Sequence, residues 1–229
     1  MRRIIGLALT LVTATSPLFG QRSGRPSGLR EVHNGGSLGG FTFVVAQPLG
    51  EFRRNGDVAA GLTGFVVAGL GRSSAVGLRI DGSYMVYDAA YRGYGISTTS
   101  SIGSLAIGPQ ITLGQGPIRP YGFATLGGSM FWTSVSDENY CGCYDSDVFF
   151  LNGRFTTVTQ LGTGLLVKLS RGRTPVALDL GVREMRHERV RYVPAGGITE
   201  NSDGSFTVDR VETPVQMRVF QIGVTFGIR

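Results

Sequence analysis

The sequence predicts an all-β protein: a single up-and-down antiparallel barrel of eight strands, of the transmembrane kind. Three observations favour this fold. The last ten residues, FQIGVTFGIR, alternate without exception between apolar and polar or small side chains, which is the period of a strand with one apolar face. Eight such segments follow one another, and their connections alternate between short and long, as they do in transmembrane barrels. Nowhere do about 18 apolar residues run together, so a helical membrane protein is excluded.

The chain opens with the features of an export signal. Arg2 and Arg3 precede an apolar segment, residues 4–14, that is too short to span a bilayer, so residues 1–20 are interpreted as a signal peptide. Residues 21–38 are polar and rich in Gly, Ser and Arg, and we expect them to form a flexible periplasmic leader. Residues 39–229 then form the barrel.

The first three expected strands cover approximately residues 40–47, 57–69 and 75–88. The turn-forming sequence PLGEFRRNG separates the first two, and GRSS precedes the third. The third strand has the clearest pair of faces. One face is apolar, and the other carries Arg79 and Asp81 among small and polar residues.

The fourth and fifth expected strands, about residues 101–113 and 120–135, are less regular. Pro109 lies inside the fourth and predicts a bulge or a local irregularity. In the fifth, Phe123 and Phe131 are eight residues apart, which corresponds to about 20 Å across a membrane at ~3.3 Å per residue and ~40° tilt. With Tyr121 and Trp132 beside them, they predict two aromatic girdles; aromatic residues scattered through a sandwich core remain the alternative.

Three more strands complete the barrel, at about residues 154–170, 174–189 and 213–229. The connections around residues 89–100, 136–150 and 190–212 are expected to be long. Within the last of them, Asp203-Gly204 is flanked by alternating residues and predicts a β-hairpin that rises above the barrel.

Glycine and alternating apolar residues recur in four segments: GGFTFVVAQPLGEF, LRIDGSYMVY, GPQITLGQGPIRPYGFATLGG and FQIGVTFGIR. In this pattern the chain resembles the small eight-stranded bacterial outer-membrane β-barrels of the OmpA transmembrane-domain and opacity-antigen type, over about residues 39–229. The resemblance implies a location in the outer membrane, contact with its lipid and lipopolysaccharide, and the barrel assembly machinery as a partner. Many members end on an aromatic residue, whereas this chain ends on Arg229 and its nearest aromatic residue is Phe226.

Charged residues on the strands are expected to face the lumen, because an Arg or Lys that faces lipid at mid-membrane costs roughly 2–4 kcal/mol. Eight strands enclose just enough room for side chains. We therefore expect an ion-pair network that fills the lumen. Its members would be Arg79, Asp81, Lys168, Asp179 and Arg183. A polar core with no further role, and a gate or narrow conduit, both remain open.

A charged run lies at the far end of the seventh strand. Arg186, Arg189 and Arg191 are candidates for contact with lipopolysaccharide phosphates, since guanidinium groups match phosphate in geometry. The alternative is a solvated strand extension above the membrane.

Cys141 and Cys143 form a C-G-C sequence within a long connection. A disulfide is the default for an exported chain, although a ring with one intervening residue is tight. Free thiols and a metal site with Asp145 and Asp147 remain open, but two thiols without His make a weak zinc site. No metal or other cofactor is expected.

Catalysis and nucleic-acid binding are not predicted. The formal charge of +6 does not by itself imply nucleic acid. Of the two histidines, His33 lies in the leader, and no serine follows His187 at the spacing found in outer-membrane lipid A deacylases. Glu188 also points to the opposite face of its strand from His187. The expected function is structural or surface-interacting through the outer loops, with a filled lumen; a narrow conduit for small solutes or apolar ligands and a soluble lipocalin-like periplasmic barrel are the alternatives.

Overall fold

The computed structural model describes residues 37–70, 75–92, 96–114, 116–137, 148–170, 175–201 and 206–228. These residues form strands and one short 3₁₀ helix, η1, at Gly50–Arg54. Within them, no helix has the length and apolar character required to cross a membrane.

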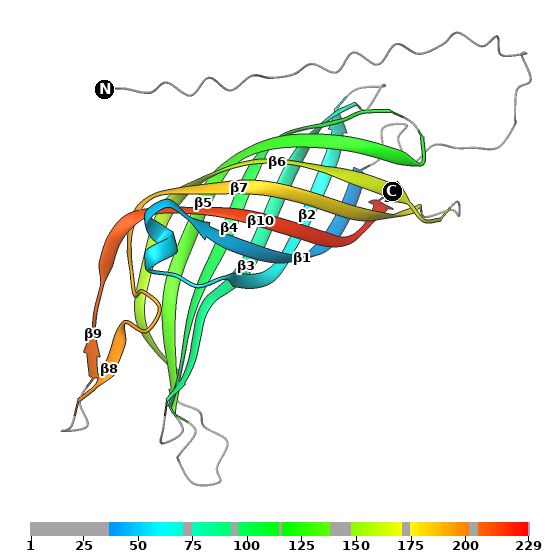
Figure 1. Ribbon diagram of the computed structural model, residues 1–229. Helices are drawn as coiled ribbons and strands as arrows, with labels where there is room; N and C mark the ends of the chain where they lie inside the picture. The colour runs from blue at the N-terminus through cyan, green and yellow to red at the C-terminus, as the bar shows by residue number, and fades with distance from the viewer. Residues whose placement is uncertain are drawn as a thin grey trace, which may run out of the picture. The chain divides into compact units, whose positions relative to one another are not determined.

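Eight strands close into an antiparallel barrel in the order β1-β10-β7-β6-β5-β4-β3-β2, which confirms the predicted fold class (Figure 1). Each strand pairs antiparallel with its neighbours on both sides, and the register shifts at Val86/Asp88, Thr133/Ser134 and Pro214/Gln216. Their bounds are β1 Ser37–Leu49, β2 Ala59–Leu70, β3 Val76–Arg92, β4 Ile96–Thr112, β5 Ile118–Asp137, β6 Val148–Lys168, β7 Val176–Tyr192 and β10 Val211–Ile228.

Several strands are longer than their sequence patterns predict. β3 and β4 run through most of the connection expected around residues 89–100, and β5 and β6 extend into the one expected around 136–150. β1 begins at Ser37, so the last residues of the expected leader belong to the barrel. The hairpin predicted around Asp203-Gly204 is present: β8 Ile198–Glu200 pairs with β9 Phe206–Val208.

The two ends of the barrel differ. Ser37 pairs with Ile228, so both ends of the barrel sequence lie at the same end, which we call the terminal end. The short connections β2–β3, β4–β5 and β6–β7 also lie there. The longer β1–β2 and β7–β10 connections lie at the opposite end, which we call the loop end.

The wall of the barrel is apolar outside, and the charged strand residues point inward. On β3, Leu78 and Ile80 are 39% and 45% exposed, whereas Arg79 between them is 0% exposed. On β1 and β10, Phe43 and Ile222 are 70% and 54% exposed and face each other across the ladder. The period-two patterns thus predicted the faces of these strands correctly.

The prediction for β5 is wrong. Tyr121, Phe123 and Phe131 are buried in the lumen, and only Trp132 of the four expected girdle residues lies on the outer side, 5.8 Å from the ring of Tyr84. Ile118, Leu126 and Met130 are exposed on the outer face of β5, with small residues such as Ala124 between them. This face is therefore apolar although most of the aromatic residues of the strand point inward.

Pro109 causes no bulge in β4, but the predicted local irregularity is present, because the pairing of β4 with β5 skips Gly108 and Pro109. Pro109 pairs with Leu78 of β3, and the register between β4 and β5 is the same on both sides of it. Its ring lies on the exposed outer side of the wall.

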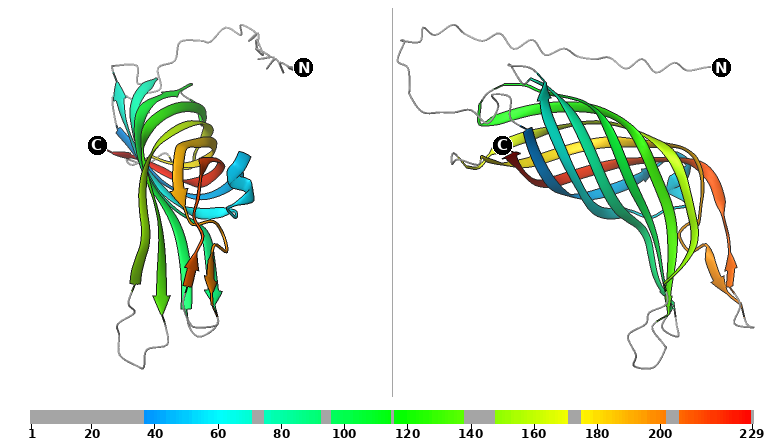
Figure 2. Two further views of the ribbon diagram at one scale, coloured as in Figure 1. Left: turned by 90° about the vertical axis from the view of Figure 1, so that its left-hand side faces the viewer. Right: turned by 180° about the vertical axis from the view of Figure 1, so that it is seen from behind.

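The wall opens above the pair Val158–His187, toward the loop end. β6 and β7 pair from that point down to the terminal end, but not beyond it in the part of the chain that the structure describes. Above it β6 continues only beside β5, and β7 only beside β10. In Figure 2 the tips of β3–β6 and the β8–β9 hairpin accordingly run out as separate groups.

Candidate functional site: the filled lumen

Arg79 is the centre of a polar layer in the terminal half of the lumen. Its Nε and Nη2 atoms donate to both carboxylate oxygens of Asp81 at 2.8–3.0 Å, and Nη1 donates to Gln110 Oε1 at 2.8 Å. The guanidinium carbon lies 3.9 Å from the ring centre of Phe65 and 4.2 Å from that of Phe123. Arg79 is therefore held by hydrogen bonds to Asp81 and Gln110 and by cation–π contacts with two aromatic rings.

Arg183 and Asp179 complete this layer. Arg183 Nη1 lies 3.7 Å from Asp81 Oδ1, and Nη2 donates to Thr63 at 2.6 Å. Its Nε has no hydrogen-bond partner among the described residues, so Arg183 is held less completely than Arg79.

Asp179 contacts no arginine at ion-pair distance within the described chain. It instead accepts hydrogen bonds from Tyr121 at 2.6 Å and from Gln221 at 3.4 Å.

Lys168 lies outside the network that the sequence suggested. It is the last residue of β6 and pairs with Ala177, two residues nearer the terminal end than Asp179. Its side chain is half-buried beside Arg119, and no described acid is within ion-pair distance of its ammonium. Because the strand ends at this mouth of the barrel, the ammonium lies beyond the enclosed polar layer.

An apolar core fills the loop half of the lumen, and sequence reasoning missed it. Many of the inward residues here are apolar, although inward faces of such barrels were expected to be polar; Ser100, Thr133 and Thr156 are polar exceptions. Phe52 of η1 turns into this core and is 0% exposed, with its ring 5.7 Å from Tyr87 and 5.4 Å from Tyr192. The other members are Val44, Ala46, Ala59, Met85, Ile102, Phe131, Val158, Met185, Val190, Val215, Met217 and Val219.

The loop-end connections are joined across this apolar core. Tyr87 donates a hydrogen bond to the carbonyl of Val193, and the amide of Ala195 donates to the carbonyl of Asn55. The β1–β2 connection is thus hydrogen-bonded to the β7–β8 connection directly above the core. Phe52 lies beneath both connections and fills the lumen at this level. PLGEFRRNG was interpreted only as a turn, since nothing local in the sequence reveals which way Phe52 points.

His187 lies between the polar and the apolar half of the lumen and contacts Ser129, which sequence reasoning did not identify as a partner. His187 Nε2 is 3.1 Å from Ser129 Oγ, and Nδ1 is 3.2 Å from the carbonyl oxygen of Val215. The ring of Phe131 packs edge-on against it at 5.2 Å. His187 is 4% exposed and Ser129 is 1% exposed, so the pair is enclosed and links β5, β7 and β10.

The arginines of the charged run lie on the outside. Glu184 accepts hydrogen bonds from Arg186 and Arg218, both at 3.1 Å, and all three side chains are exposed. Arg191 pairs with Glu212 at 3.2 Å, and Arg189 is exposed. Arg218 was missed, because its strand is far away in sequence and only the register of β7 with β10 places it opposite Glu184.

Cys141, Cys143, Asp145 and Asp147 lie outside the described residues, so their pairing stays a prediction. Among the described residues, no group of three or more His, Cys, Asp or Glu side chains is placed to hold a metal ion.

A closed eight-stranded barrel with an apolar outer wall and a lumen filled by side chains defines the class of the small outer-membrane-type β-barrels. No family model and no curated protein matches the chain. Among solved structures it is similar to Neisserial surface protein A, with 17% identity over 84% of this chain and 97% of that one and a TM-score of 0.48.

Two further similar structures are a major outer membrane protein of Thermus thermophilus and Ail of Yersinia pestis. The first is 12% identical over 83% of this chain and 99% of that one, with a TM-score of 0.47. The second, solved with the heparin analogue sucrose octasulfate, is 11% identical over 84% and 97%, with a TM-score of 0.45. At these identities the likeness concerns the fold alone.

Proposed function

We propose that the chain is an outer-membrane β-barrel with a closed lumen and a structural or surface-interacting role. The observation that carries the proposal is the continuous apolar wall. On β3 the outward residues run without a charge from Val76 to Val86. At ~3.3 Å per residue and ~40° tilt these positions span about 25 Å, the height of the apolar band of a membrane barrel. The terminal end then faces the periplasm, and the loop end faces the cell exterior.

The two layers of the lumen favour a closed barrel over a conduit. The Arg79 layer fills the periplasmic half, and the apolar core with Phe52 fills the outer half. A solute would have to displace both in series. The enclosed Ser129–His187 pair offers a substrate no approach from solvent, which favours a non-enzymatic role.

A soluble lipocalin-like barrel needs the opposite arrangement, with the apolar faces inside and the charges outside. Here the charges of Arg79 and Asp81 are enclosed, while every barrel strand carries large exposed apolar residues on its outer side. An exposed apolar surface of this extent is typical of a membrane-embedded wall.

Cell fractionation with electrophoresis tests the membrane proposal. We expect the protein in the outer-membrane fraction, with a mobility that shifts between unboiled and boiled samples because the barrel stays folded in detergent until it is heated. Recovery in the aqueous periplasmic fraction, with the same mobility in both samples, would contradict the proposal.

The exposed arginines above the apolar wall support contact with lipopolysaccharide phosphates. Arg186 and Arg218 share one carboxylate, that of Glu184, so the three side chains carry a net positive charge at the level where headgroups begin. Insertion by the barrel assembly machinery and contact with a surface partner through the outer loops belong to the same proposal.

Binding of lipopolysaccharide to the purified protein tests this contact. The double substitution Arg186→Gln with Arg218→Gln is expected to weaken binding several-fold at low salt and much less at high salt, because these exposed charges are screened. Glu184→Gln is the matched control, since it releases both arginines and is expected to strengthen binding. Equal affinity of the unmodified protein and both variants would show that these arginines are solvent-exposed side chains that do not contribute to lipopolysaccharide binding.

A further inference from the structure

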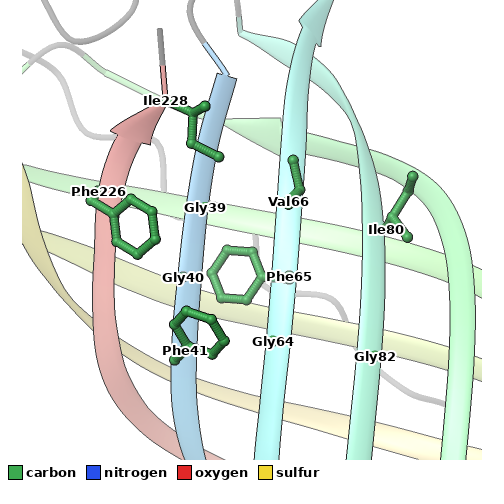
Figure 3. A pocket seen from close by; sticks show the side chains of 10 residues that line it. All are labelled: Gly39, Gly40, Phe41, Gly64, Phe65, Val66, Ile80, Gly82, Phe226 and Ile228. Carbon is green, nitrogen blue, oxygen red and sulfur yellow. The ribbon is translucent and has the colours of Figure 1, made fainter.

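A groove of about 280 Å³ lies on the outer side of the wall, where β1 and β10 meet and β2 and β3 continue the sheet. Its lining is almost wholly apolar. Figure 3 shows Phe41, Val66, Ile80, Phe226 and Ile228 around glycines of β1, β2 and β3. The glycines are Gly39, Gly40, Gly64 and Gly82.

The glycines keep this part of the wall hollow. Gly64 and Gly82 face each other across the β2–β3 ladder on the outward side. A Cβ added at Gly82 would meet no atom within 4 Å, so open space lies above it. The ring of Phe41 leans toward Gly64 and lies 6.3 Å from that of Phe226, which forms one flank of the groove.

The groove belongs to the periplasmic half of the barrel. Gly39 and Phe41 are among the first residues of β1, and Phe226 and Ile228 are among the last of β10. In hydrocarbon there is no hydrophobic force to fill such a hollow, but an unfilled one forfeits dispersion contacts along its whole lining. A flexible apolar chain that follows the groove recovers those contacts.

We propose that the groove binds an acyl chain of a phospholipid from the periplasmic leaflet. This rests on the proposed function, because it requires the wall to face lipid. A second copy of the chain is a poorer occupant. Copies inserted in the same direction place their grooves at the same depth, so two hollows would meet. The most exposed outer aromatic side chain, Phe155 at 79%, lies in the other half of the wall and cannot reach the groove of such a copy.

Fluorescence quenching in detergent micelles tests the proposal. Trp132→Phe removes the only tryptophan, and Ile80→Trp then places one at the edge of the groove. Leu180→Trp in the same background is the matched control: Ile80 and Leu180 are each the fifth residue of their strands, both face outward, and β3 and β7 lie on opposite sides of the barrel. Phosphatidylcholine with brominated acyl chains is titrated into the micelles as the quencher.

If an acyl chain binds in the groove, quenching of Ile80→Trp is expected to saturate, whereas quenching of Leu180→Trp is expected to rise in proportion to the lipid. Half of the quenching of Ile80→Trp is expected at about a tenfold lower lipid-to-detergent ratio than the same quenching of Leu180→Trp. A tenfold difference corresponds to ~1.4 kcal/mol. Gly82→Leu, which fills the hollow, is expected to abolish the saturable part and to leave Leu180→Trp unchanged. Proportional quenching at both positions would contradict acyl-chain binding in the groove and would still support a wall that faces lipid. No quenching at either would overturn both. Quenching at Leu180→Trp alone, together with a dimer in detergent, would assign the groove to a second copy instead.

Discussion

Replacing Arg79 by methionine is expected to lower the free energy of unfolding by about 3–5 kcal/mol, because it leaves the carboxylate of Asp81 buried without its main partner. Arg79 donates three hydrogen bonds to Asp81 and one to Gln110. The variant loses these bonds and also the cation–π contacts with Phe65 and Phe123. Urea unfolding in lipid bilayers, followed by the loss of the heat-sensitive mobility shift, measures the change.

Two variants make this result specific. Arg186→Met breaks an exposed pair and is expected to cost about 0–1 kcal/mol. Arg79→Met combined with Asp81→Leu removes both buried charges and is expected to recover much of the loss. If Arg79→Met cost no more than Arg186→Met, the polar layer would not be held together by this pair, and Arg183 would be sufficient to neutralise Asp81.

Phe52→Ala is expected to destabilise the barrel by about 3–5 kcal/mol, since it removes a fully buried aromatic side chain from the apolar core and leaves a cavity. Unlike the outer wall, this core is sealed from water by the connections at the loop end, so the hydrophobic effect acts on it as in a soluble protein. The same urea titration measures the loss, and proteolysis of the β1–β2 connection is expected to accelerate because η1 is no longer anchored.

The same variant separates a closed barrel from a conduit. Phe52→Ala is expected to show no steady single-channel conductance, because the Arg79 layer still closes the lumen below it. Phe52→Leu, which keeps an apolar anchor, is expected to lose about 1.5 kcal/mol or less. Steady conductance of Phe52→Ala would show that the apolar core alone blocks ion passage through the lumen, and it would favour a conduit as the function.

The sequence was informative where a strand has one clean face. β3, β7 and β10 alternate strictly, so the side that meets lipid and the inward position of Arg79, Asp179 and Arg183 could be predicted. It was uninformative for β5, whose inner face mixes aromatic with polar residues, and the prediction that Phe123 and Phe131 belong to outer girdles was wrong. Periodicity identifies two faces but cannot tell which one is outside when both contain aromatic residues.

Contacts between distant segments could not be predicted from one sequence. Ser129 meets His187 and Arg218 meets Glu184 only because of the strand register, which a period-two pattern does not specify. The apolar core was missed for a related reason. Met85, Met185 and Met217 look unremarkable within their own strands, and their common environment exists only when the barrel closes and η1 folds over it.

The separation of β6 from β7 above Val158 and His187 gives the exterior portion two leaves that share no backbone hydrogen bonds between these strands. One leaf continues β3–β6, and the other consists of the upper parts of β7 and β10. A load applied to one leaf, such as the pull of an antibody bound at the tip of β5, therefore does not pass directly from β6 to β7. It reaches the other leaf through the side chains packed around Phe52, the Tyr87–Val193 hydrogen bond and the paired strands β3, β2, β1 and β10. The molecule can flex at its outer rim while the portion within the bilayer keeps its shape.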